Sequence, residues 1–79
     1  MDATHQPPAV LTRAQLDLLK QRVEAGADPR GVALWISRIT ATGRLSVDTI
    51  TAAAEDLRRG DGAKWYTAAD AAAKESGTL

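Results

Sequence analysis

Apolar side chains recur at intervals of three or four residues in three stretches of this chain, with polar side chains between them. This spacing places the apolar residues on one face of an α-helix, which completes a turn about every 3.6 residues. The pattern therefore predicts three amphipathic helices, over residues 13–25, from residue 29 to residue 41 or 42, and over residues 47–59. Their predicted inward-facing residues are Leu16, Leu19 and Val23, then Val32, Trp35, Ile36 and Ile39, then Val47, Ile50, Ala54 and Leu57.

Residues that favour helix ends border each of these stretches. Short polar side chains, which can accept a hydrogen bond from the first-turn amides of a helix, precede the three helices. They are Thr12, Asp28 and Ser46. Glycines, which readily adopt the left-handed conformation that ends many helices, follow them. They are Gly26, Gly43 and Gly60. The links between the helices are short, and short links join antiparallel neighbours.

The segment after the last of these glycines allows two interpretations. In the first, a helix begins near Ala63. In the second, Trp65 and Tyr66 remain in the link, and Thr67 caps a shorter helix over residues 68–75. Alanines in this segment favour a helix in either case, but they offer little apolar surface to bury.

Together these elements predict an all-α fold, a small bundle of three to four helices built as two antiparallel helical hairpins. A single helical domain is expected over residues 10–76. Two prolines keep the chain before it extended, so residues 1–9 are expected to form a flexible N-terminal tail, and residues 77–79 a frayed C-terminus. A domain of 79 residues buries a modest share of its surface, so the core is expected to be small.

The residue types that most enzymes and metal sites need are scarce. The chain has no cysteine and one histidine, His5, which lies in the predicted tail. Zinc sites need several such ligands, and a general base needs a partner in a pocket. The acidic residues, Asp56 among them, are spread over predicted exposed helix faces. We therefore expect no catalytic residue, no metal site and no cofactor, so that the protein is not an enzyme.

Apolar runs are too short for a membrane segment. None approaches the roughly 18 residues that cross a bilayer, and the first residues lack the pattern of a signal peptide. The absence of cysteine fits a reducing compartment. We expect a cytoplasmic protein without membrane contact.

Arginines suggest one candidate function, nucleic-acid binding. Ten lysines and arginines balance ten aspartates and glutamates, so attraction to phosphates would have to be local. The segment Leu45-Ser46-Val47-Asp48-Thr49-Ile50 resembles the recognition helix of helix-turn-helix DNA-binding regulators. That resemblance implies that helix 47–59 would enter the major groove and present Ser46, Asp48 and Thr49 to the bases. The arginines that would contact phosphates are Arg38, Arg44, Arg58 and Arg59.

Leucines and aromatic residues suggest the other candidate function, protein binding. Successive helical residues are about 100° apart, which places Leu18 about 160° from the apolar face of its helix, and Leu34 similarly on the next helix. Either the later helices cover these two leucines, or they form a docking or dimer surface. Trp65 and Tyr66, beside a glycine turn, are further candidates, unless they fill the core.

We favour protein binding as the function. The expected protein is a small adaptor or inhibitor that covers a surface of another protein, or of a second copy of itself as a homodimer. The partner-binding residues would be Leu18, Leu34, Trp65 and Tyr66. Small size, neutral charge and abundant alanine and arginine are also typical of accessory proteins of phages and mobile elements.

Overall fold

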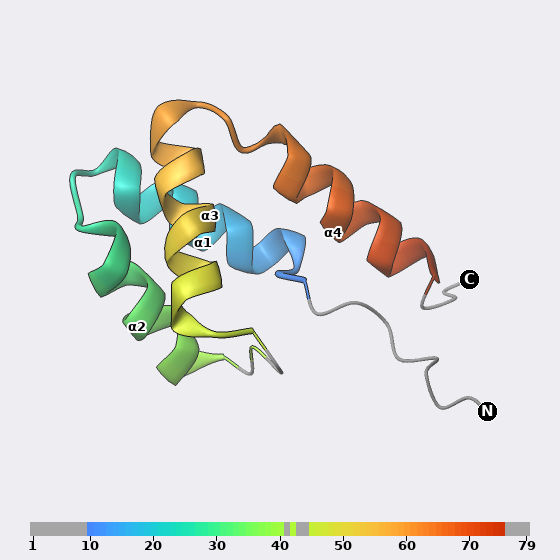
Figure 1. The fold of residues 1–79 in the computed structure, drawn as a ribbon, viewed down its shortest axis with the longest axis horizontal. Helices are drawn as coiled ribbons and strands as arrows, with labels where there is room; N and C mark the ends of the chain where they lie inside the picture. Colours follow the sequence, from blue (N-terminus) through green and yellow to red (C-terminus); the bar gives the residue numbers. More distant parts are fainter. Residues whose placement is uncertain (1–9, 41, 43–44, 76–79) are drawn as a thin grey trace.

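The chain folds into helices joined by short links (Figure 1). The computed structural model describes residues 10–40, 42 and 45–75. Over these residues there are four helices and no strand: α1 (Arg13–Glu24), α2 (Pro29–Ile39), α3 (Val47–Arg59) and α4 (Ala63–Glu75). The predicted all-α bundle is confirmed. The predicted N-terminal tail and frayed C-terminus, and the predicted stop at Gly43, lie outside the described residues.

Side-chain caps fix the starts of the first three helices, as predicted. Thr12 begins α1 with a reciprocal pair of bonds, because its hydroxyl accepts from the Gln15 amide at 3.1 Å and its own amide donates to Gln15 Oε1 at 2.9 Å. The carboxylate of Asp28 accepts from the Gly31 amide at 3.0 Å to begin α2. The hydroxyl of Ser46 does the same for α3.

The helix ends depend on glycine in two cases and on a threonine in the third. Gly26 and Gly60 have φ of 100° and 85°, the left-handed region that glycine adopts without strain. Helix α2 ends at Ile39, two or three residues before the predicted end, because Thr40 is extended. Its hydroxyl accepts from Gln15 Nε2 at 2.8 Å and donates to the Ile36 carbonyl, which holds this conformation against α1.

Helices α1, α2 and α3 pack against one another and enclose the core. The predicted inward faces are confirmed for most residues. The buried apolar residues are Leu11, Leu16, Leu19, Val23, Val32, Ala33, Ile36, Ile50, Ala53, Ala54, Leu57 and Ala69. The prediction for Ile39 was wrong, since half of its surface is exposed. It is the last residue of α2, and the chain leaves the helix at Thr40, so no further helical turn shields it.

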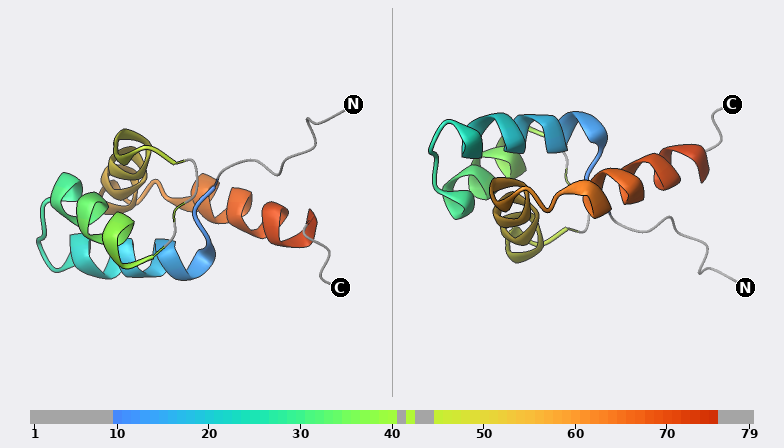
Figure 2. Two further views of the ribbon diagram at one scale, coloured as in Figure 1. Left: turned by 90° about the horizontal axis from the view of Figure 1, so that it is seen from below. Right: turned by 90° about the horizontal axis from the view of Figure 1, so that it is seen from above.

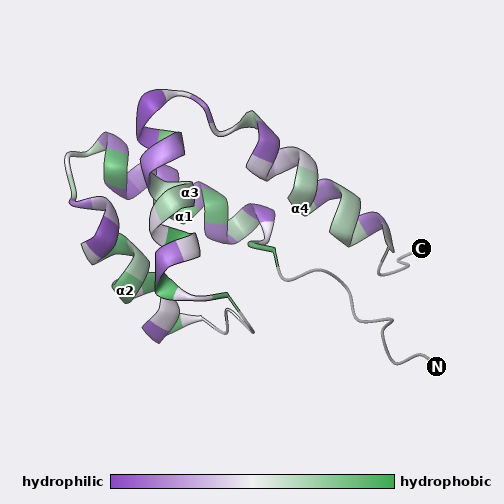
Figure 3. Cartoon of the chain, in the orientation of Figure 1, coloured by the Kyte–Doolittle hydropathy of each residue, from purple (hydrophilic) through white to green (hydrophobic). Residues whose placement is uncertain are grey.

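Helix α4 begins at Ala63, which confirms the first of the two interpretations of this segment. It packs mainly on α1, and among its described residues Ala69 is the one that joins the buried core. Its C-terminal half projects beyond the three-helix unit (Figures 1 and 2). In Figure 3 it alternates the pale green of alanine with purple polar residues, consistent with a thin apolar contact. None of the helices in the described part of the chain is long and apolar enough to cross a bilayer.

Candidate protein-binding surface

Helix α2 carries the exposed large apolar side chains of the described residues. Leu34 is 46% exposed and Ile39 is 50% exposed, while Trp35 between them is partly buried against the core. At about 100° per residue, Leu34, Trp35 and Ile39 share an arc of about 140° with Gly31 and Arg38. We call these five residues the outer face of α2. The opposite side of the helix carries the residues that fill the core.

A hollow lies at the N-terminal half of this face. It is open to solvent, has a volume of about 220 Å³, and is lined by Arg22, Ala27, Asp28, Gly31, Val32 and Trp35. The guanidinium of Arg22 lies 4.2 Å from the centroid of the Trp35 ring, which orients the indole along one wall. A Cβ at Gly31 would meet only the Asp28 side chain, at 3.7 and 3.8 Å, so glycine here leaves the helix backbone open to close approach.

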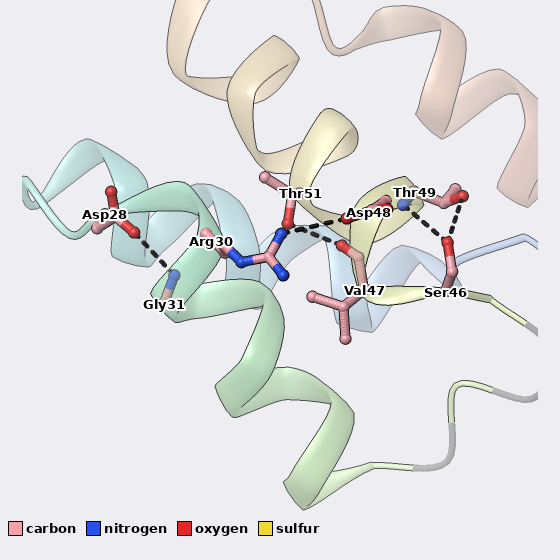
Figure 4. Close-up of polar contacts among 8 residues, drawn as sticks. All are labelled: Asp28, Arg30, Gly31, Ser46, Val47, Asp48, Thr49 and Thr51. Carbon is pink, nitrogen blue, oxygen red and sulfur yellow. Dashed lines mark hydrogen bonds and ion pairs between the residues drawn. The ribbon is translucent and has the colours of Figure 1, made fainter.

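Charged groups mark the two ends of the outer face. Asp28, the cap of α2, stands at the N-terminal end, and Arg38 stands in the last turn. Arg38 is exposed and has no ion pair with another residue of the described part. Arg30 pairs with Asp48 at 3.1 Å, which joins the first turn of α2 to the start of α3 (Figure 4).

The predicted partner-binding residues lie on three helices. Leu34 is exposed on α2, whereas Leu18 on α1 is half-buried and packs against the core. Leu18 therefore offers less surface to a partner than the sequence predicted. Trp65 and Tyr66 are half-buried in the first turns of α4. Each has a specific polar partner within the chain.

Trp65 belongs to a cluster around Asp56, a residue whose role the sequence did not predict. Asp56 is 8% exposed, so its predicted place on an exposed face was wrong. The indole of Trp65 donates to its Oδ2 at 2.8 Å, Lys64 lies 3.3 Å from the same oxygen, and Arg59 pairs with Oδ1. The indole hydrogen bond, with Lys64 and Arg59, holds the pKa of Asp56 below its ordinary value, although burial opposes this.

The burial of Asp56 could have been predicted from its position in α3. It follows Ala53 by three residues and precedes Leu57, so it lies on the buried side of α3. A carboxylate on that side needs hydrogen-bond donors, and the last residue of α3 and the first turn of α4 supply them. The cluster joins the end of α3 to the start of α4, so its role is to stabilise the fold.

Tyr66 fastens α4 to α1. Its hydroxyl donates to Asp17 Oδ1 at 2.6 Å, and the guanidinium of Arg13 lies 5.1 Å from the centroid of its ring. Burial, together with Asp17, raises the pKa of Tyr66 to about 12. Arg13 also reaches both carboxylate oxygens of Asp70 at 3.2 Å. Trp65 and Tyr66 thus act as anchors of α4 in this structure.

The residues of the nucleic-acid alternative are not gathered on one surface. Ser46 Oγ accepts from the Thr49 amide at 3.1 Å and lies 3.1 Å from the Thr49 hydroxyl, so both groups are used in capping α3 (Figure 4). Arg58 and Arg59 stand at the other end of α3, about 20 Å along a helix of this length. Arg59 pairs with Asp56 and Asp61. Arg44 lies outside the described residues.

Among the described residues, no group of three or more His, Cys, Asp or Glu side chains is placed to hold a metal ion. Comparison of the chain with protein-family models, with curated proteins and with solved structures returns no match.

Proposed function

We propose that the chain is a non-enzymatic interaction module that covers a protein surface with the outer face of α2, as a small adaptor or inhibitor. The observation that supports this proposal is the exposure of Leu34 and Ile39 on one helix, to about half of their surface. Burying a fully exposed side chain of this size contributes about 1.5–3 kcal/mol, so covering the exposed half of each residue contributes roughly half of that to a complex. Arg38 at the edge would orient the partner rather than supply most of the affinity.

The compartment that fits this proposal is the cytoplasm. The chain has no cysteine, so a reducing environment removes nothing that stabilises it. Its helices pack through apolar side chains, and this packing does not depend on disulfide bonds.

Substitution of Leu34 tests the proposal. We expect Leu34→Asp to remove the proteins that the tagged chain captures from extracts of its native host, as identified by mass spectrometry. Ala52→Asp is the matched control, because Ala52 is exposed on α3 and receives the same charge. Circular dichroism should show equal helicity for both variants. If Leu34→Asp captures what the control captures, the outer face of α2 is not the binding surface.

DNA binding through α3 is the second candidate, supported by the exposure of Ser46 and Arg58 together with the resemblance of the segment over residues 45–50. Phosphate contacts predict an affinity for duplex DNA that falls steeply with rising salt. Fluorescence anisotropy with labelled duplex, from about 20 mM to about 200 mM salt, measures this dependence. Binding at low salt that Arg58→Gln weakens would favour this function over the first.

A further inference from the structure

We infer that the protein surface covered by the outer face of α2 is the same face of a second copy of this chain. The two α2 helices would pair antiparallel about a two-fold axis at the level of Ala33. This inference rests on the proposed function and names its partner. Both the shape and the charges of the face fit such a pairing.

The face is complementary to itself in shape. Its N-terminal half carries the hollow beside Gly31, and its C-terminal half carries the exposed Ile39. An antiparallel pair centred on Ala33 places Ile39 of each copy opposite Ala27 of the other, at the hollow. It also sets Trp35 against Gly31, where the missing side chain lets the backbones approach. A two-fold pairing uses each hollow and each protrusion once.

The charges of the face select the same orientation. Asp28 and Arg38 stand at its opposite ends, five residues on either side of Ala33. Antiparallel pairing therefore brings each Arg38 to the Asp28 of the other copy, whereas parallel pairing would align like charges. One oxygen of Asp28 caps α2, and the carboxylate has a second oxygen to accept from a guanidinium. The net charge of zero adds no long-range repulsion between copies.

The length of α2 limits the area of the dimer interface and therefore its affinity. Its 11 residues span about 16 Å, so the interface is small and the association depends on concentration. Leu34 lies beside the axis and contacts its counterpart. Its side chain is therefore the one whose replacement should affect association most.

Sedimentation equilibrium of the full chain, in a series up to about 1 mM, tests association. We expect the apparent mass to rise with concentration from 8.4 kDa toward twice that value. Leu34→Asp should weaken association at least about 10-fold, and Ala52→Asp should leave it unchanged, with equal helicity in both variants. Dimerisation that Leu34→Asp does not weaken would overturn the inference, because another surface would then join the copies.

Cross-linking tests the orientation, since the chain has no cysteine of its own. Leu34→Cys lies near the axis and should form a disulfide dimer under mild oxidation. Arg38→Cys should not cross-link to its counterpart, which lies about 15 Å away along an antiparallel pair. Rapid cross-linking of Arg38→Cys would show parallel pairing and overturn the inference.

A double-mutant cycle tests the predicted contact between Asp28 of one copy and Arg38 of the other. Asp28→Asn keeps the helix cap and removes the charge, and Arg38→Gln removes its partner. Each variant should weaken dimerisation about 2- to 10-fold, and the double variant should weaken it no further than either single one. Additive effects would show that the two residues do not meet.

The results also separate this inference from the proposed function. A chain that stays monomeric at every concentration, but loses a captured host protein through Leu34→Asp, overturns the second copy as partner and supports the function. A monomeric chain whose captured proteins are indifferent to Leu34→Asp overturns both.

Discussion

Among single residues, the buried carboxylate of Asp56 joins two helices through its polar partners. It lies on the core side of α3, and donors from three residues surround it, among them the indole of Trp65. A charged group inside a small core is tolerated only when it is paired and hydrogen-bonded. Asp56 meets that condition by drawing the first turn of α4 onto the end of α3.

Replacing Asp56 by alanine should therefore destabilise the fold by about 1–3 kcal/mol, because the half-buried indole N–H of Trp65 loses its acceptor. Asp56→Asn keeps an acceptor and should cost less. Urea unfolding followed by circular dichroism gives the free energy of unfolding for both variants. Equal losses from the two substitutions would mean that the charge, rather than the hydrogen bond, carries the stabilisation.

The pH dependence of Asp56 follows from the same cluster. Its pKa in the folded state lies below the ordinary value of 3.8, so the folded state binds this proton less readily than the unfolded state. The stabilisation is present above pH 3.8 and is lost as the pH falls through the lowered pKa. Urea unfolding between pH 2 and pH 5 should show a steeper loss for the natural chain than for Asp56→Asn. Parallel curves for the two proteins would contradict this prediction.

The contribution of Tyr66 to stability depends on pH in the opposite direction. Its pKa is raised to about 12, so the folded state keeps the phenol proton that the unfolded state loses near 10. The stabilisation is present below pH 10 and disappears as the pH rises through about 12. Tyr66 is the single tyrosine of the chain, so the phenolate absorbance near 295 nm reports on it alone. A midpoint near 10 in a chain that is still helical would show that the contact with Asp17 does not form.

At the scale of elements, local chemistry explains why the helix starts could be predicted from the sequence. Thr12, Asp28 and Ser46 each bond to an amide within the following turn, so no distant residue is needed to place them. The exposure of Ile39 depends instead on the end of α2 at Thr40, which a side chain of α1 holds, and the partial burial of Leu18 depends on its packing against the core. The cluster at Asp56 depends on the turn between α3 and α4, which periodicity does not describe.

Replacing a glycine by alanine should have opposite effects on stability at Gly62, in the turn before α4, and at Gly31, in α2. A Cβ at Gly62 would overlap the buried side chain of Leu57, so Gly62→Ala should destabilise the fold by about 1–3 kcal/mol. Gly31→Ala has open space and a helical backbone, so it should stabilise the monomer by up to about 1 kcal/mol. Thermal unfolding at low concentration compares the two. A stabilising effect at both positions would show that the contact between Gly62 and Leu57 is loose.

Across the described part of the molecule, the four helices are not equally well anchored. Helices α1, α2 and α3 share one buried apolar cluster, whereas α4 adds Ala69 to it and otherwise depends on Trp65, Tyr66 and the bond between Arg13 and Asp70. An exposed ion pair such as the last stabilises by no more than about 1 kcal/mol. The free energy that opens α4 alone should therefore be smaller than the free energy of global unfolding.

Native-state amide hydrogen exchange measures this difference directly. The amides of α4 should exchange faster than those of α3, with the least protection in the half that projects from the bundle. Tyr66→Phe removes the hydrogen bond to Asp17 but keeps the ring near Arg13, so it should speed exchange in α4 by about 2- to 10-fold and leave α2 and α3 nearly unchanged. Equal acceleration in all four helices would mean that α4 opens only when the whole bundle unfolds, and that the bundle is a single cooperative unit.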